Sequence, residues 1–260
     1  MKFIKLLIVF LSLAILSSCV DTEEYIVINA DNSGSYTYTM DLGKMMAMIS
    51  QMGGENNKDR QLDKLDSLIH LNDLGFSANE LTAAEKELYK NATVRIKTDK
   101  TNAEMKIIMF CPFKSIDQLP EIKDSLFLVL NKIKAFEKIT GKEEEIANIS
   151  EEDKNSQKTL TPASGNYKFK AVPGMIESSV IDPEGIKNAI SSDSTIMMMQ
   201  QMISMMGEPT YKTTITTAKE IKSYTGNGAL LAPDKRSVTF ISTFSEMLEY
   251  PGKLAYKIEY

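Results

Sequence analysis

The chain has 260 residues, with 30 Lys or Arg, 35 Asp or Glu and a formal net charge of −5. Because nucleic-acid binding depends on clustered basic residues that neutralise phosphates, this acidic balance, without a basic stripe, argues against a nucleic-acid partner. One histidine, two cysteines and no tryptophan leave few residues for metal, disulfide or stacking chemistry.

Residues 1–18 have the order of a secretory signal. Lys2 and Lys5 precede an apolar run from Leu6 to Leu16, and small residues lead up to Cys19. The run is far shorter than the about 20 residues that a membrane-spanning helix needs. Removal of residues 1–18 changes the net charge to −7, because two lysines are lost.

The segment Leu16-Ser17-Ser18-Cys19 resembles the processing site of bacterial lipoproteins. This resemblance implies cleavage before Cys19, diacylglycerol on its thiol and a further acyl chain, such as palmitate, on the new amino terminus. Several chains together anchor a protein stably to a membrane. The alternative is a plain secretory signal with an incidental Cys19. If Cys19 is lipidated, only Cys111 remains, and no intrachain disulfide can form.

Residues 19–24 carry an acidic cluster directly after Cys19. This cluster resembles the export signal of Bacteroidota-type lipoproteins, which implies the outer membrane and display on the cell surface. Val20 occupies the position where an inner-membrane retention signal has Asp. The simpler interpretation is a solvated acidic tether near the headgroups.

The first half of the chain predicts two hairpins and several helices. Residues 25–30 and 35–40 alternate as strands around the turn residues 31–34. A helix is predicted at 41–53, a second over 62–69, and a third to about 90, since Thr82 and Glu85 have capping-box spacing. A second hairpin covers 94–96 and 105–109, and Pro112 is predicted to end it. The longest helix follows Ser115 and has its apolar stripe at Ile122, Leu126, Val129, Ile133 and Phe136.

The second half of the chain predicts a similar mixture of strands and short helices. Residues 140–166 contain almost no large apolar residue and predict a flexible linker or loop. Strands are then predicted at 167–171, 211–217, 237–241 and 254–260, with a short helix after Asp182-Pro183 and another from Ser191 or Asp193 to Gly207. In the last strand, apolar and polar residues alternate as in a sheet with one face on a core.

These elements predict an α+β fold in which an antiparallel sheet built from hairpins has helices on one face. The organisation is a signal peptide (1–18), an acidic tether (19–24), an N-terminal α+β region (25–139), a linker (140–166) and a C-terminal α+β region (167–260). The two α+β regions form either one domain or two similar sub-domains.

Methionine is abundant, with 16 residues. Two clusters stand out: Met45, Met46, Met48 and Met52, and then Met197, Met198, Met199, Met202, Met205 and Met206. Rows of thioethers one helical turn apart are soft ligands that could hold Cu(I). Methionine as an adaptable core or contact residue explains the same pattern without a metal.

No motif predicts catalysis. His70, at the predicted end of the helix 62–69, is the single histidine, and it is expected to interact with the last helical carbonyls. Cys111 lies in a strand-like run and is expected to be a buried, inert thiol. The lack of tryptophan lowers the case for a carbohydrate site, although the ten tyrosines could stack on sugars.

At the level of families, Tyr25 to Ser35 resembles the opening hairpin of uncharacterised Gram-negative lipoproteins, in which a D-x-S-G turn follows the lipid anchor. The segments 227–229 and 234–238 are similar to their C-terminal region and, more distantly, to LppM-type lipoprotein domains. The resemblance implies an α+β fold and no known activity.

Together, these features predict a non-enzymatic lipoprotein of the outer membrane with no cofactor. Its role is either structural or the binding of a ligand or an envelope protein partner. The alternative is a Met-rich lipoprotein that handles Cu(I) or another soft metal.

Overall fold

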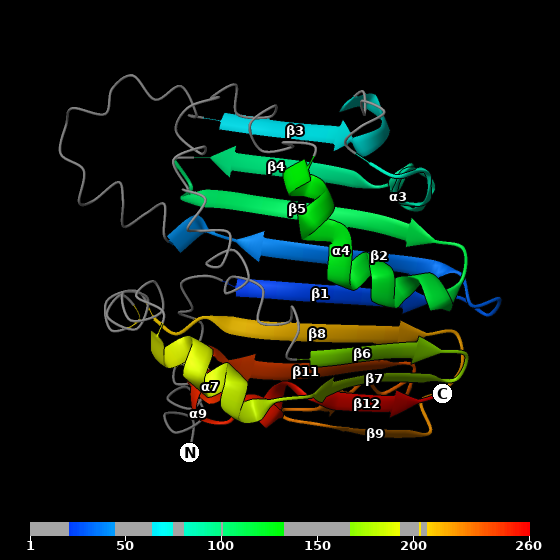
Figure 1. Cartoon of the computed structure of the whole chain (residues 1–260), viewed down its shortest axis with the longest axis vertical. Coiled ribbons are helices and arrows are strands. Elements are labelled where there is room, and N and C mark those ends of the chain that lie inside the picture. Colours follow the sequence, from blue (N-terminus) through cyan, green and yellow to red (C-terminus); the bar gives the residue numbers. More distant parts are fainter. Residues whose placement is uncertain are drawn as a thin grey trace, which may run out of the picture.

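The computed structural model describes residues 21–44, 64–74, 81–99, 101–132, 167–192, 203 and 207–260. These residues form two sheets with a few short helices (Figure 1), which confirms the predicted α+β class. The signal segment, Cys19, the predicted helix at 41–53 beyond Lys44, the predicted linker and both methionine clusters lie outside the described residues.

The larger sheet has eight strands in the order β10-β11-β8-β1-β2-β5-β4-β3. Their bounds are β1 Asp21–Ile28, β2 Gly34–Asp41, β3 Lys64–His70, β4 Thr93–Asp99, β5 Glu104–Phe113, β8 Thr210–Thr217, β10 Leu230–Leu231 and β11 Ser237–Thr243. All neighbours are antiparallel except β1 and β8, which are parallel. Through this parallel pair, the N-terminal and C-terminal regions share one sheet.

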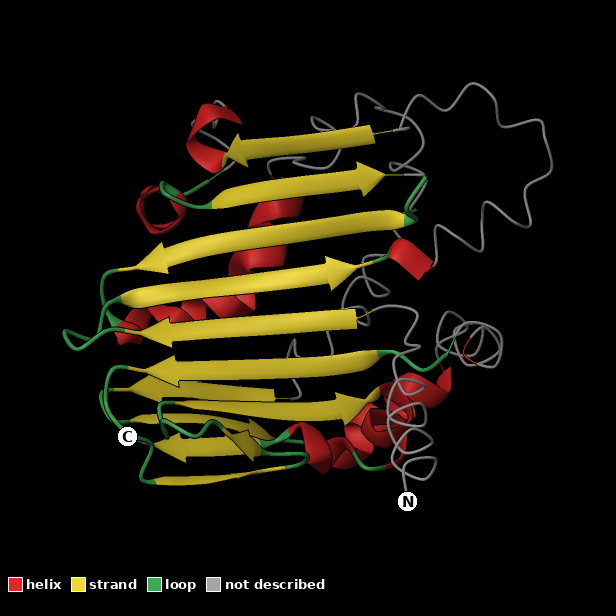
Figure 2. Cartoon of the chain, turned by 180° about the vertical axis from the view of Figure 1, so that it is seen from behind, coloured by secondary structure: helices red, strands yellow, loops and turns green. Residues whose placement is uncertain are grey.

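The smaller sheet has four antiparallel strands in the order β6-β7-β12-β9. Their bounds are β6 Tyr167–Val172, β7 Met175–Val180, β12 Tyr256–Glu259 and β9 Ser223–Gly226. This sheet and helix α4 (Leu119–Lys132) lie on the same side of the larger sheet (Figure 1). The view from behind shows the other face of β1, β2, β5 and β4 in front of α4 (Figure 2).

Short helices complete the described chain. They are α3 Ala83–Tyr89, α7 Pro183–Ser192, α9 Phe244–Glu249 and the 3-10 turns η1 Leu71–Leu74, η2 Ile116–Gln118 and η4 Pro251–Leu254. The capping box predicted for Thr82 and Glu85 is present, and so is the helix predicted after Asp182-Pro183. Another capping box at Thr243 and Glu246 begins α9, which the sequence pattern did not reveal.

The main core lies between the larger sheet and the elements that cover it. Ile26 and Ile28 of β1 and Val94 of β4 belong to the same buried hydrophobic cluster as Ile122, Leu126 and Val129 of α4. The predicted stripe of the longest helix is therefore confirmed as far as Lys132, where the described part of α4 ends. Cys111 is fully buried and free, as predicted.

The predicted helix over 62–69 is wrong, because residues 64–70 form the edge strand β3. Leu65 and Ile69 face inward at a strand spacing, whereas Leu68, which a helical stripe would bury, is 58% exposed. His70 is therefore the exposed last residue of a strand, and its predicted role at a helix end fails.

Pro112 does not end β5, which continues to Phe113. The pairing of β5 with β4 stops at Phe110, whereas its pairing with β2 extends to Phe113. Pro112 therefore has no paired residue in β4, and the missing N–H group of proline is tolerated at such an unpaired edge of a strand.

The predicted acidic tether at 19–24 is also corrected. Asp21, Glu23 and Glu24 are residues of β1, which is paired along its whole length with β2 on one side and β8 on the other. Strand pairing satisfies the backbone groups of this acidic segment, and Glu24 points to the same face as Ile26 and Ile28. Only Cys19 and Val20 then separate the predicted cleavage site from the folded chain.

Candidate functional site

A pocket of about 120 Å³ lies between the two sheets. This volume is similar to that of an engineered cavity of about 150 Å³ that admits one benzene ring. Its lining residues come from three strands of the larger sheet, three strands of the smaller sheet, α4 and η4: Thr22, Glu24, Tyr36, Tyr38, Lys123, Asp124, Tyr167, Phe169, Ser178, Tyr211, Lys212, Thr213, Leu254 and Tyr256. Six of these residues are aromatic.

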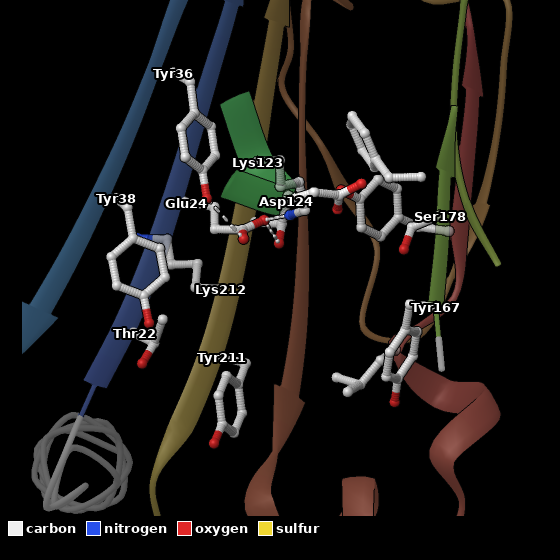
Figure 3. A pocket seen from close by; sticks show the side chains of 14 residues that line it. Thr22, Glu24, Tyr36, Tyr38, Lys123, Asp124, Tyr167, Ser178, Tyr211 and Lys212 are labelled. Carbon is white, nitrogen blue, oxygen red and sulfur yellow. Dashed lines mark hydrogen bonds and ion pairs between the residues drawn. The ribbon is translucent and has the colours of Figure 1, made fainter. Parts of the chain in front are cut away.

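The first wall is the inner face of β1, β2 and β8. Strand alternation places Thr22 and Glu24 on the face that also carries the buried Ile26. The register then sets Glu24 opposite Tyr38 in β2 and beside Thr213 in β8. In Figure 3, the side chains of Tyr36, Tyr38 and Tyr211 project from this wall.

The second wall is formed by the smaller sheet. Phe169 of β6, Ser178 of β7 and Tyr256 of β12 occupy one row across three paired strands. The ring of Tyr256 stacks on that of Phe240 with 4.9 Å between centroids, which fixes its orientation. Tyr167 lies farther along this wall (Figure 3). Its Oη donates a hydrogen bond to the Pro251 carbonyl at 3.4 Å.

A charged pair occupies the centre of the pocket. The Lys123 ammonium donates a hydrogen bond to Glu24 Oε2, and the two side chains are only 12% and 17% exposed. Tyr36 Oη donates to Glu24 Oε1 at 3.1 Å, and Thr213 Oγ1 donates to Oε2 at 3.3 Å. The carboxylate is thus held by three donors.

Aromatic faces surround the Lys123 ammonium. Its Nζ lies 5.1 Å from the centroid of Phe169 and 5.8 Å from that of Tyr36. Both distances are within the range at which a ring face attracts a cation. The site therefore stabilises a positive charge by a carboxylate and by two rings.

The tyrosine hydroxyls of the pocket keep their protons at physiological pH. Burial raises the pKa of Tyr211 to about 12. Burial also raises the pKa values of Tyr36 and Tyr256 far above the usual range, and the nearby Glu24 charge raises both further. Neutral phenols serve as hydrogen-bond donors and acceptors.

Two further polar groups line the pocket, one buried and one exposed. Tyr256 Oη is buried and has no hydrogen-bond partner among the described residues. Burial raises the pKa of Asp124, and the positive charge of the adjacent Lys123 lowers it in part. Asp124 is exposed, and it makes no hydrogen bond or ion pair with another residue of the described part of the chain.

The residues singled out from the sequence are not brought together. His70 and Cys111 line no part of this pocket, and burial raises the pKa of the Cys111 thiol to about 12. Cys19 and the methionines of both clusters are outside the described residues, so lipidation and Cu(I) binding stay predictions. Within the described ranges, no group of three His, Cys, Asp or Glu side chains could hold a metal ion.

The sequence interpretation missed the pocket itself. Two features of the sequence could have revealed it. In a strand over this segment, Glu24 lies on the same inward face as Ile26 and Ile28, and the next strand has two tyrosines at alternate positions. The contribution of Lys123 and of the smaller sheet depends on tertiary packing, which strand alternation does not reveal.

Among the described residues, no helix is long and apolar enough to cross a bilayer. The sequence matches no protein-family model and no curated protein. The folded domain of the LppM protein of Mycobacterium tuberculosis, solved by NMR, is a distant structural neighbour with 9% identity and a TM-score of 0.32, over 94% of this chain and 91% of that domain. Membership of the expected Bacteroidota-type lipoprotein family therefore stays a prediction.

Proposed function

We propose that this protein is a lipid-anchored binding protein of the cell envelope, which holds a small ring-bearing ligand in the pocket between its two sheets. The observation that carries the binding role is the set of six aromatic side chains around the buried Glu24–Lys123 pair. Ligand sites are typically apolar and aromatic concavities with a few polar groups that fix orientation.

The proposed role is non-enzymatic. Both carboxylate oxygens of Glu24 already accept hydrogen bonds, from Lys123, Tyr36 and Thr213. The tyrosine hydroxyls around it are neutral, because their pKa values are raised. These groups are suited to orienting a ligand by hydrogen bonds.

Anchoring through Cys19 is the second part of the proposal. It is supported by the signal-like order of residues 1–18 and by Leu16-Ser17-Ser18-Cys19. Mass spectrometry of the N-terminal peptide should show acyl chains on Cys19, and Cys19→Ala should move the protein out of the membrane fraction. An unmodified N-terminal peptide from the membrane fraction would contradict the anchor.

The proposed location is the outer membrane, with the domain on the cell surface. The acidic residues after Cys19 support this location, although Asp21, Glu23 and Glu24 also belong to β1. Proteinase added to intact cells should degrade the protein. Protection in intact cells together with degradation after lysis would contradict surface display.

The binding role can be tested with three ring compounds of similar size: benzylammonium, benzyl alcohol and benzoate. At least one should bind the full chain, and binding should be lost in Ser178→Leu, which adds two non-hydrogen atoms of side chain to the pocket. Ser179→Leu is the matched control, because Ser179 is adjacent but alternates to the opposite face of β7.

Both serine variants must first show cooperative thermal unfolding. Leu254→Phe provides a second way to fill the pocket, from η4. If no compound binds the original chain above the level of the filled variants, the proposed binding role is wrong.

A further inference from the structure

The buried hydroxyl of Tyr256 is the first observation that points to a ligand. Tyr256 is 7% exposed, lines the pocket and has no hydrogen-bond partner for Oη among the described residues. Its ring cannot turn away freely, because it stacks on Phe240. A buried polar atom without a partner is unfavourable, so a ligand that hydrogen-bonds with this hydroxyl gains affinity.

The charges around the pocket give the second observation. Glu24 and Lys123 neutralise one another, and Lys212 is paired with Glu23 at 3.3 Å between Nζ and Oε1. Asp124 is the remaining charged group of the lining, and its carboxylate has no ion-pair partner in the described part of the chain. When Glu23 outside the lining is counted with its partner Lys212, the charges of these five residues sum to −1 with Asp124 ionised.

The aromatic walls give the third observation. Ring faces carry partial negative charge and attract cations, and the positions of Phe169 and Tyr36 around the Lys123 ammonium show this attraction within the pocket. In Figure 3, Tyr167 and Tyr211 lie on opposite sides, away from the Glu24–Lys123 pair. The pocket thus has a charged part and an aromatic part.

We propose that the ligand is an organic cation, with an ammonium group near Asp124 and Tyr256 and an apolar or aromatic body between Tyr167 and Tyr211. This inference rests on the proposed binding function and names its ligand class. An anion would face the carboxylates of Glu24 and Asp124. A neutral ring would make no charge contact with Asp124.

The order of affinities of the three ring compounds tests the ligand class. With the purified full chain at neutral pH, and with Ser178→Leu as the blank, calorimetry should show benzylammonium binding about tenfold more tightly than benzyl alcohol, the scale of one partly desolvated charge contact. Benzoate should bind most weakly. Equal or tighter binding of benzyl alcohol or benzoate would overturn the cation assignment while leaving the binding role intact.

Replacement of Asp124 tests whether its carboxylate recognises the ammonium group. Asp124→Asn should abolish the preference for benzylammonium over benzyl alcohol, whereas Glu121→Gln, an exposed site on the same helix outside the pocket, should retain it. Tyr256→Phe should weaken benzylammonium and benzyl alcohol, because both lose the same hydrogen bond. A preference that persists in Asp124→Asn would overturn the assignment, and binding of no compound would contradict the proposed function as well.

Discussion

Lys123 donates a hydrogen bond to Glu24 across 99 positions of sequence, and this contact joins α4 to the first strand of the larger sheet. Both side chains are largely buried. Loss of one partner from a buried pair is costly, because the other charge is left uncompensated in a medium that solvates it poorly.

We therefore expect Lys123→Met to lower the free energy of unfolding by about 3 kcal/mol. The double variant Lys123→Met/Glu24→Gln should recover much of this loss, because neither charge remains buried alone. Urea unfolding at neutral pH, analysed as a double-mutant cycle, measures both effects.

The exposed pair Arg95–Asp66 is the control for this cycle. Its side chains are 49% and 42% exposed, so Arg95→Met should change the free energy of unfolding by less than about 1 kcal/mol. Within the acidic segment, Glu23→Gln should be equally mild, whereas Glu24→Gln should not. Equal effects of Glu23→Gln and Glu24→Gln would mean that this segment behaves as a tether after all.

Gly34 is expected to be intolerant of a side chain. A Cβ atom at this position would lie 1.9 Å from the Val27 carbonyl oxygen and 2.5 Å from the Phe113 ring. Because the backbone oxygen cannot move without disturbing the β1–β2 pairing, Gly34→Ala should destabilise the fold by about 2 kcal/mol or more.

Gly252 in η4 is the control site, since no described residue other than its chain neighbours has an atom within 4 Å of a Cβ built there. Gly252→Ala should leave the thermal midpoint within a few degrees of the original. A similar midpoint for Gly34→Ala would show that the strand pair relaxes more easily than its geometry implies.

Local sequence patterns predicted most of the elements of this fold. The hairpin turn at 31–34, the capping box at Thr82 and the buried stripe of α4 are set by neighbouring residues, and each is confirmed. The prediction for residues 62–69 was wrong because leucines spaced by three are typical of one face of a helix. The same leucines also fit a strand in which Leu68 lies on the exposed side.

The pocket depends on contacts that local patterns do not specify. The parallel pairing of β1 with β8 joins positions 189 residues apart in sequence. Glu24 acquires its buried environment only through this pairing and through α4. The same acidic residue is consistent with a solvated tether when the chain is considered one segment at a time.

Cys111 is expected to be unreactive in the folded protein. Burial raises the pKa of its thiol to about 12, so the reactive thiolate is scarce at pH 8. In a chain with Cys19→Ser, an aromatic disulfide reagent should react with Cys111 only after urea is added. Rapid reaction without urea would show that β5 opens readily.

The pocket tyrosines should make the fold sensitive to alkali. In the unfolded chain, phenols ionise near pH 10, whereas burial raises the pKa of Tyr211 to about 12 and those of Tyr36 and Tyr256 higher still. Above pH 10, the folded state therefore binds more protons than the unfolded state. The free energy of unfolding should be steady below pH 9 and fall above pH 10, by up to about 1.4 kcal/mol per pH unit for each such group.

Tyr256→Phe isolates one of these groups. At pH 7, the variant should be as stable as the original or slightly more stable, because a buried hydroxyl without a partner is removed. Above pH 10, its free energy of unfolding should fall less steeply, since one fewer proton is released on unfolding. Urea midpoints between pH 7 and 11 measure this, with Tyr250→Phe, at a 58% exposed site, as the control. Identical slopes for Tyr256→Phe and the original chain would show that the Tyr256 hydroxyl is solvated in the folded protein.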